Sequence, residues 1–295
     1  MTNLTRNGYS LIIPYFNEGK TISITLQEYI YELEKLSINY EIIIVDDGSY
    51  LQAKDFIKKT IDNLLIIEHS INKGYGSAIN TGIKNSKFEN IIITDSDNTY
   101  PAEKIVEMIK SYERFPCMVV ASREGKNANI PLLRRPAKYL LRMLACYLCS
   151  YRIRDLNSGF RIFKKEFYQK YVNLMPNRFS MTSTLTILAV MHNYDIYYIK
   201  SDYRKRKGNS KINPIKDTAK FLSLVLKLVI LTDGMRVFFP LSLLMIFSSI
   251  FILMLRLIGF TIGGATSVIL FCSGIQILCF GALCKCINYR NGKGR

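Results

Sequence analysis

The first half of the chain alternates short apolar runs with longer amphipathic segments. Four helical patterns cover Thr21–Leu36, Gln52–Ile61, Ser77–Asn85 and Pro101–Tyr112. Between them are runs rich in Ile, Val and Leu that have the length of buried strands, and these are Leu11–Ile13, Glu41–Val45, Leu64–Glu68, Ile91–Thr94 and Met118–Ala121. This alternation predicts an α/β fold with a mostly parallel sheet and helices on both faces. Ligands of such sheets bind at the carboxyl ends of the strands.

Two long apolar segments follow near the C-terminus. Val237–Leu255 and Phe260–Leu283 contain no charged residue, and each approaches or exceeds the roughly 20 residues that a helix needs to span a bilayer. The short link Arg256–Gly259 between them predicts a helical hairpin, with the Arg256 side chain reaching toward the far headgroups. A buried helix pair in a soluble domain is the alternative interpretation.

Basic residues flank the outer ends of the predicted hairpin. They are Lys205, Arg206, Lys207, Lys211, Lys216, Lys220, Lys227 and Arg236 before it, and Lys285, Arg290, Lys293 and Arg295 after it. The positive-inside rule then places both ends, and the preceding domain, in the cytoplasm. The segment Met1–Ser10 has no apolar signal-peptide core, which agrees with that placement.

These patterns predict four regions along the chain. Residues 1–212 form a cytoplasmic domain, and 213–236 form juxtamembrane helices, of which Phe221–Leu231 lies in the membrane interface. Two transmembrane helices, at about 237–256 and 260–283, lie within 237–284, and 285–295 is a basic tail. The protein is thus expected to be a multi-pass protein of the cell inner or plasma membrane.

The charge balance narrows the choice of partner. Lys and Arg number 40 against 23 acids, a formal net charge of +17, which suits nucleic acid, a phosphate-rich substrate or a membrane. Because the basic residues cluster beside the apolar hairpin, we expect anionic lipid headgroups and no nucleic acid. The helical pattern Leu132–Tyr151 is either an amphipathic surface helix or a helix at the membrane interface.

The cysteines and histidines suggest little chemistry. Of seven cysteines, Cys146 and Cys149 have the spacing of a metal or redox pair, but a second pair with suitable spacing is missing, so we expect buried, reduced thiols. His69 ends a predicted strand and His192 lies in a helical pattern. We expect both histidines to be structural.

Asp95-Ser96-Asp97 is the most informative polar cluster. It follows the apolar run Ile91–Thr94, and because side chains alternate along a strand, Asp95 and Asp97 can point the same way. Paired carboxylates suit a hard cation such as Mg²⁺ or Mn²⁺, which commonly binds a diphosphate. A solvated loop with helix-capping acids is the alternative.

Three more polar clusters follow the first three strands. Residues 14–18, Pro-Tyr-Phe-Asn-Glu, could hold a nucleobase and ribose, with Pro14 ending the strand ladder, or could form a plain turn. Residues 46–49, Asp-Asp-Gly-Ser, could bind a base or ribose through one acid, although Ser49 or an Asp can also cap a helix. Residues 72–76, Asn-Lys-Gly-Tyr-Gly, form an anion-friendly helix start or an ordinary glycine turn.

These clusters, in this order and spacing, resemble those of GT-A glycosyltransferases of family 2. Two further segments, Asp155–Arg161 and Arg206–Ile212, resemble motifs of the polyprenyl-phosphate group, which includes dolichol-phosphate mannose synthases and undecaprenyl-phosphate sugar transferases. The similarity covers nearly the whole chain, including the hairpin. It implies a GT-A, Rossmann-like domain followed by interfacial helices and a two-helix transmembrane hairpin.

The resemblance also implies roles for particular residues. The nucleotide sugar would contact Pro14, Tyr15, Asn17, Glu18, Asp46, Asp47, Lys73, Asp95, Ser96 and Ser210. Asp95 and Asp97 would hold Mg²⁺ or Mn²⁺, and the catalytic residues would be Asp97, Arg206 and Lys211. Arg123, Arg134 and Arg135 would hold the acceptor phosphate. Some relatives have Gln two residues after the second Asp, where this chain has Thr99.

The implied reaction moves a single sugar from a UDP- or GDP-sugar to polyprenyl phosphate by a metal-dependent, inverting single displacement. Undecaprenyl phosphate is the acceptor that we expect. The acceptor phosphate is largely a dianion near neutral pH, so a general base is not required, and clustered Arg and Lys suit two anionic substrates. The alternatives are a glycosyltransferase that extends a cell-surface polysaccharide and a catalytically silent scaffold. The oligomeric state stays open, with a homo-oligomer as one option.

Overall fold

The computed structural model describes most of the predicted catalytic domain and hairpin. The described residues are 8–57, 61–115, 118–124, 143, 146–147, 151, 153–177, 181–204, 223, 226–227, 229–230, 233–258 and 264–290. Of residues 288–290, only the backbone is described. Contacts divide the chain into two units. The first comprises Met1–Arg142 and Arg152–Pro214, and the second comprises Met143–Tyr151 and Ile215–Arg295.

A mixed sheet forms the centre of the first unit. In the part of the chain that the structure describes, seven strands pair in the spatial order β3-β2-β1-β4-β6-β5-β7. Their bounds are Tyr9–Tyr15 (β1), Tyr40–Asp46 (β2), Leu64–Glu68 (β3), Asn90–Ile93 (β4), Met118–Ser122 (β5), Arg161–Lys164 (β6) and Ile196–Lys200 (β7). β1 pairs in parallel with β2 and β4, with Ile12 opposite Ile43 and Ile93. β6 is antiparallel to both β4 and β5.

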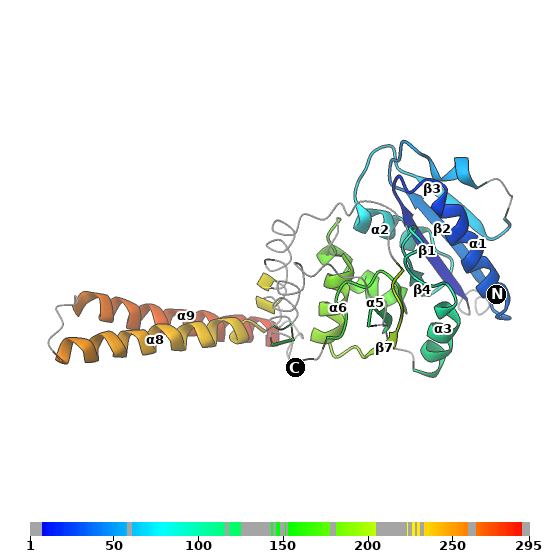
Figure 1. Ribbon diagram of the computed structural model, residues 1–295. Coiled ribbons are helices and arrows are strands. Elements are labelled where there is room, and N and C mark those ends of the chain that lie inside the picture. Colours follow the sequence, from blue (N-terminus) through cyan, green and yellow to red (C-terminus); the bar gives the residue numbers. More distant parts are fainter. Residues whose placement is uncertain are drawn as a thin grey trace. The chain divides into compact units, whose positions relative to one another are not determined.

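Helices cover both faces of this sheet (Figure 1). They are α1 (Thr21–Glu34), α2 (Tyr75–Asn85), α3 (Lys104–Arg114), α5 (Lys165–Lys170) and α6 (Met181–Met191), with 3-10 turns at Ala53–Phe56 and Val172–Leu174. Leu11 and Ile13 of β1 point into a core shared with α1 and α3. Ile12 points to the opposite face, where it lies against Gly82 of α2. Because side chains alternate along β1, the strand contributes apolar side chains to the packing on both faces of the sheet.

Most predicted elements of the first unit are confirmed, with shifted ends. β3 has the predicted bounds, and the other four predicted strands form with ends that differ by one or two residues. The helix predicted at Gln52–Ile61 is wrong, because only Ala53–Phe56 is helical among its described residues. Side chains bind backbone amides where that helix would begin: Asn17 accepts from Tyr50 and Leu51, and Asp46 accepts from Ala53. These bonds fix a compact turn, and the non-helical backbone of Ile57 (φ −110°, ψ 90°) ends the helical residues after Phe56.

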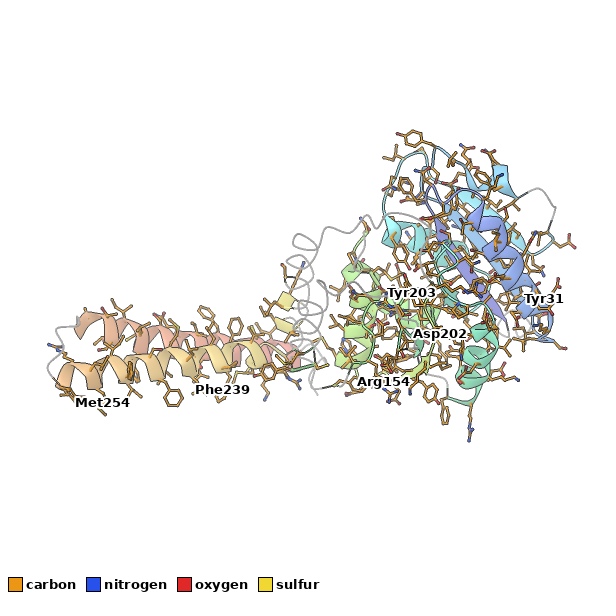
Figure 2. All side chains as sticks on the ribbon, in the orientation of Figure 1. Tyr31, Arg154, Asp202, Tyr203, Phe239 and Met254 are labelled. Atoms are coloured by element: carbon orange, nitrogen blue, oxygen red, sulfur yellow. The ribbon has the colours of Figure 1, made fainter. Side chains whose placement is uncertain are left out.

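Two apolar helices form a hairpin in the second unit. They are α8 (Met235–Leu257) and α9 (Gly264–Arg290), which pack against each other (Figure 1). Both are long and apolar enough to cross a membrane, and most of each candidate span is exposed. Phe239 and Met254 project outward from α8 (Figure 2), and Phe247 is 64 % exposed. A core helix of a soluble domain would bury such side chains, so the exposure favours lipid contact.

The hairpin differs in detail from the predicted one. α8 runs two residues further than Leu255, and α9 continues beyond Leu283 to Arg290. Residues 259–263 lie outside the described part, so the predicted start of the second span at Phe260 does too. Much of Leu132–Tyr151 and Phe221–Leu231 also lies outside it.

Small residues bring α8 and α9 into contact at intervals of seven residues. Ser249 donates through its hydroxyl to the Ser267 carbonyl at 2.7 Å. Seven residues further along α9, a Cβ at Gly274 would lie 2.7 Å from Ile246 Cγ1 and 3.2 Å from the Ser242 carbonyl oxygen. One more interval leads to Gly281, where a Cβ would lie 2.8 Å from Met235 Sδ. In lipid, helices associate through such close backbone packing.

Replacing Gly274 with Leu should separate the two helices. The added side chain has no space against Ile246, and overpacking of this kind typically costs about 1–3 kcal/mol. The midpoint of helix loss during SDS titration in mixed micelles, followed by circular dichroism, should fall. Ile269→Leu, at a position 63 % exposed on the same helix, is the matched control and should leave the midpoint unchanged. Equal midpoints for all three proteins would contradict the packing described above.

Candidate functional site

The sheet has a switch point beside β1. From β1 the chain proceeds outward to β2 and β3, and it then returns to β4 on the other side of β1. At such a point the connections diverge and leave a crevice at the carboxyl ends of the strands. β1 ends at Tyr15 and β4 ends at Ile93. The predicted polar clusters at 14–18 and 95–97 therefore follow the two strands on either side of this switch point.

Asp95 and Asp97 follow β4, and neighbouring side chains hold both. Asp95 Oδ1 accepts a hydrogen bond from the Tyr75 hydroxyl at 3.2 Å. Asp97 Oδ1 accepts from the Thr99 hydroxyl at 2.6 Å and from the Thr99 backbone N–H at 3.2 Å. The Ser96 carbonyl accepts from the Thr25 hydroxyl at 3.2 Å, which ties the turn to α1. Both residues are partly exposed.

Hydrogen bonds link the loop after β1 to the loop after β2. The Tyr15 hydroxyl donates to the Leu51 carbonyl at 2.6 Å and accepts from the Gly19 N–H at 3.1 Å. Asp46 accepts from Ser49 N–H through one oxygen and from Ala53 N–H through the other. Tyr15 is 1 % exposed and Asp46 is 2 % exposed. These two side chains thus shape the loops, and their predicted contact with a nucleoside stays a prediction, as does that of Glu18.

Pro14 does not end the strand ladder, contrary to prediction. β1 continues through Pro14, opposite Val45, to Tyr15. In a parallel strand, alternate residues bond to alternate neighbours, and Ile12, two residues earlier, accepts from Thr94 after β4. Pro14 faces the same side, where β4 has already ended at Ile93. Its missing N–H therefore costs no bond within the β4 ladder.

Asp47 organises the loop before α2. Its Oδ1 accepts from the Lys73 N–H at 2.9 Å, and its Oδ2 accepts from the Gly74 N–H at 2.7 Å. His69 Nδ1 lies 2.7 Å from Asp47 Oδ1, and His69 Nε2 lies 2.9 Å from the Thr81 hydroxyl. His69 is thus structural, as expected, with both ring nitrogens bonded. Asp47 is 3 % exposed, while Lys73 is exposed at the same loop.

His192 also has a structural setting, although it lies one residue beyond α6 and not inside a helix. Its ring stacks on Tyr171 with centroids 4.6 Å apart. Neither histidine lies at the end of β4, where the two acids are. The described part of the site therefore relies on carboxylates, hydroxyls and guanidinium groups.

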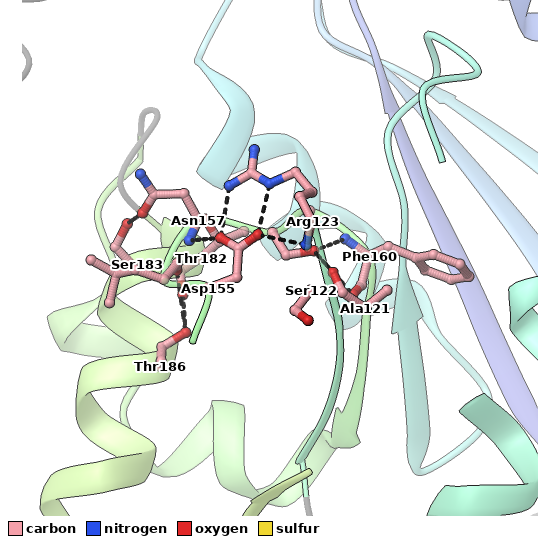
Figure 3. A network of polar contacts seen from close by, with 12 residues as sticks. Ala121, Ser122, Arg123, Asp155, Asn157, Phe160, Thr182, Ser183 and Thr186 are labelled. Atoms are coloured by element: carbon pink, nitrogen blue, oxygen red, sulfur yellow. Dashed lines mark hydrogen bonds and ion pairs between the residues drawn. The ribbon is translucent and has the colours of Figure 1, made fainter. Parts of the chain in front are cut away.

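Arg123 forms a largely buried ion pair with Asp155 (Figure 3). Arg123 Nε donates to Asp155 Oδ2 and Arg123 Nη2 donates to Asp155 Oδ1, each at 2.7 Å. The side chains are 17 % and 5 % exposed, respectively. Burial opposes the charge on Arg123, but Asp155, Tyr100 and Tyr203 together outweigh burial and hold the pKa of the guanidinium well above its usual value. Arg123 therefore presents a fixed positive charge after β5.

Arg161 is fully buried at the start of β6. Its guanidinium donates to the carbonyl oxygens of Ser158 and Thr182, on the 155–161 segment and on α6. It also donates to the Thr186 hydroxyl at 2.9 Å. Burial lowers the pKa of Arg161, while the nearby Tyr75 raises it. Arg161 thus fixes the segment Asp155–Arg161 against α6.

The donor set at Asp95 and Asp97 fits a hard divalent cation. It consists of oxygen atoms, which suit Mg²⁺ and Mn²⁺. Within the described ranges, no group of three or more His, Cys, Asp or Glu side chains is placed to hold a metal. A cation here would therefore complete its coordination with water or with oxygens of a bound phosphate, as Mg²⁺ sites commonly do. Thr99 serves to orient Asp97, through the bonds given above.

Several predicted site residues cannot be placed. Arg134, Arg135, Arg206, Ser210 and Lys211 lie outside the described residues. Sequence reasoning assigned no role to Tyr75, Tyr100, Asp155, Gly159 or Arg161, although it noted the segments that contain four of them.

A family model and several known proteins match this chain. The model of the family described as glycosyl transferase family 2 matches residues 10–173. A human dolichyl-phosphate beta-glucosyltransferase is 28 % identical over 226 residues, which cover 70 % of this chain and 69 % of the relative. A dolichyl-phosphate hexose transferase of Haloferax volcanii is 23 % identical over 237 residues, which cover 80 % of this chain and 100 % of the relative.

A solved structure supports the fold. The glucosyl-3-phosphoglycerate synthase of Mycobacterium tuberculosis, solved with Mn²⁺, UDP and glucosyl-3-phosphoglycerate, is similar with a TM-score of 0.54 at 16 % identity. The match covers 75 % of this chain and 79 % of that one, so the GT-A-like fold is confirmed. Because the family model matches more than half of the 295 residues, the chain belongs to glycosyl transferase family 2 and is a glycosyltransferase.

Proposed function

We propose that this protein transfers one sugar from a nucleotide-sugar donor to the phosphate of a polyprenyl lipid in a membrane. The observation that carries the proposal is the presence, in one chain, of the family 2 site and of two helices long and apolar enough to span a bilayer. The relatives named as dolichyl-phosphate sugar transferases support the same acceptor class. The protein would therefore be a multi-pass membrane protein with its catalytic domain in the cytoplasm.

The donor would bind in the crevice at the carboxyl ends of β1, β2 and β4. The loops fastened by Tyr15, Asn17 and Asp46 would hold the nucleoside, with Glu18, Lys73 and Ser96 at its edge. Asp95 and Asp97 would hold Mg²⁺ or Mn²⁺ against the diphosphate. The structural neighbour solved with Mn²⁺ and UDP supports this combination. A cation bound there supplies Lewis acidity to the departing nucleoside diphosphate.

The acceptor phosphate would be held by Arg123, with Arg134 and Arg135 as further candidates. A phosphate monoester has a second pKa near 6 and is largely a dianion at neutral pH. The attacking oxygen then needs no general base. Asp155 fits this view, because both of its oxygens accept hydrogen bonds from Arg123. Its task would be to orient the guanidinium toward the phosphate.

In the proposed reaction, the phosphate oxygen forms a bond to the anomeric carbon while the bond from that carbon to the donor diphosphate breaks. A single displacement of this kind inverts the anomeric centre. The protein holds two anions together and balances charge as the nucleoside diphosphate departs. Arg206, Ser210 and Lys211 are the side chains that we propose for this closing contact.

The test is transfer of labelled sugar by the full-length protein in liposomes. The donors are UDP-glucose, UDP-N-acetylglucosamine and GDP-mannose, and the vesicles contain undecaprenyl phosphate, dolichyl phosphate or neither. We expect the label in an organic-extractable, acid-labile lipid with Mn²⁺ or Mg²⁺, and none with EDTA. The two lipid arms decide the prenyl type.

Two outcomes would contradict the proposed function. Label in water-soluble polymer alone would indicate a polysaccharide-extending enzyme. No label with any donor, together with no binding of either UDP or GDP, would indicate a scaffold. Transfer to either polyprenyl phosphate would support the proposed acceptor class.

A further inference from the structure

We propose that Gly159 and Tyr75 are positioning residues that hold the Asp95 carboxylate in the orientation needed to bind a cation. This inference rests on the proposed function, because it assumes that Asp95 binds the metal. The two residues come from different parts of the chain: Tyr75 begins α2, and Gly159 precedes β6. They contact the same side chain at the end of β4.

Gly159 provides a surface without a side chain for the carboxylate. A Cβ at this position would lie 2.6 Å from Asp95 Oδ1, 2.7 Å from Oδ2 and 2.8 Å from Cγ. All three distances are shorter than any normal contact, so the whole carboxyl group lies against the Gly159 backbone. Even an added methyl group would force Asp95 to turn. The close contact with Asp95, and not the backbone conformation, therefore explains the glycine at this position, because Gly159 is not among the glycines with a positive φ.

Tyr75 holds the same carboxylate through a hydrogen bond. Its hydroxyl donates to Asp95 Oδ1 at 3.2 Å. A phenol hydroxyl carries a proton at neutral pH and a carboxylate can only accept, so Tyr75 is the donor in this bond. Oδ1 is thereby oriented by Tyr75, while both carboxylate oxygens lie against Gly159.

Tyr100 fixes Gly159 relative to the two acids. The Tyr100 hydroxyl accepts from the Gly159 N–H at 2.8 Å and lies 3.3 Å from the Ser158 hydroxyl. Ser158 donates its proton to the Ala121 carbonyl at 2.6 Å. Because Tyr100 comes from the turn that follows Asp97, the contacts form a closed circuit from Asp95 through Tyr100 to Gly159 and back to Asp95. The segment that follows β4 thus both carries Asp95 and, through Tyr100, holds Gly159 in place against it.

The test measures Mn²⁺ binding by electron paramagnetic resonance, with full-length protein in detergent. We expect Gly159→Ala to weaken Mn²⁺ binding by roughly tenfold or more, since residues that orient metal ligands typically have effects of this size. Tyr75→Phe, which keeps the ring and removes the hydroxyl, should weaken binding severalfold. Both variants should also change the zero-field splitting of bound Mn²⁺, which loss of stability alone would not do.

Gly82→Ala is the matched control. Its methyl group would lie 2.5 Å from Ile12 Cγ2, so it crowds the core as closely but away from Asp95. We expect a lower unfolding temperature with unchanged Mn²⁺ affinity. If both Gly159→Ala and Tyr75→Phe bound Mn²⁺ with wild-type affinity, this inference would be overturned and the proposed function would stand. Absence of Mn²⁺ binding by the unmodified chain, with and without UDP or GDP, would overturn the metal part of the proposed function and this inference with it.

Discussion

Asp97→Asn should reduce sugar transfer by about a thousandfold. The substitution keeps the size of the side chain and its ability to accept from Thr99, but it removes the charge that would bind the cation. A cation acting as a Lewis acid contributes several kcal/mol to such a reaction, and about 4 kcal/mol corresponds to a factor of roughly a thousand. Initial rates of lipid-linked product, measured at saturating Mn²⁺, give the comparison.

Asp62→Asn is the control for this charge change. Asp62 is exposed in the turn before β3, at the amino end of the sheet and away from the carboxyl-end crevice. Its variant should transfer sugar at the wild-type rate. Activity of Asp97→Asn within a few-fold of wild type would show that the second acid does not take part in metal binding. Equal losses in both variants would show that net charge matters and the site does not.

Breaking the Arg123–Asp155 ion pair should cost both stability and activity. Asp155→Ala leaves a largely buried guanidinium without its bidentate partner, and breaking such a pair typically costs about 3–5 kcal/mol. The thermal unfolding midpoint in detergent should fall on the order of 10 °C. Transfer should also fall, with the larger change in the KM for polyprenyl phosphate, because Arg123 loses its orientation toward the acceptor.

A double variant separates the two effects. Arg123→Met combined with Asp155→Leu removes both charges together, and replacing a buried pair with apolar residues is often neutral for stability. We expect its unfolding midpoint to recover part of the loss while transfer stays low, because Asp155 also accepts from the backbone N–H groups of Arg123 and Asn157. Glu107→Ala, which breaks the exposed pair of Lys104 and Glu107, should change stability by less than about 1 kcal/mol. Full activity in the double variant would exclude Arg123 as a contact of the acceptor phosphate.

The sequence predicts the parallel core of this fold because that part has local signals. The isoleucine-rich runs of β1, β2 and β4 are buried on both faces and are read directly as strands. Polar residues at their ends then indicate the carboxyl edge of the sheet. The placement of Asp95 and Asp97 after β4 follows from those two facts.

The rest depends on contacts between distant residues. β6 is short and antiparallel, and it is inserted between β4 and β5 although it follows both in the chain. No local pattern specifies that insertion. The contact of Gly159 with Asp95 and the pairing of Arg123 with Asp155 arise from it, so neither was predictable. The Gln52–Ile61 helix failed for a related reason, because the Asn17 and Asp46 side chains bind the amides of Tyr50 and Ala53 and fix the turn where that helix would begin.

Binding of nucleoside diphosphate with and without metal tests the central claim most directly. Isothermal titration calorimetry of the full-length protein with UDP and with GDP, each in Mn²⁺ and in EDTA, gives four affinities. We predict that Mn²⁺ strengthens the binding of at least one nucleotide by tenfold or more, which is roughly the effect of one added charge-assisted contact. Asp95→Asn combined with Asp97→Asn should abolish this gain. Binding that is equally tight in Mn²⁺ and in EDTA would contradict the claim that these two acids hold a cation on the donor diphosphate.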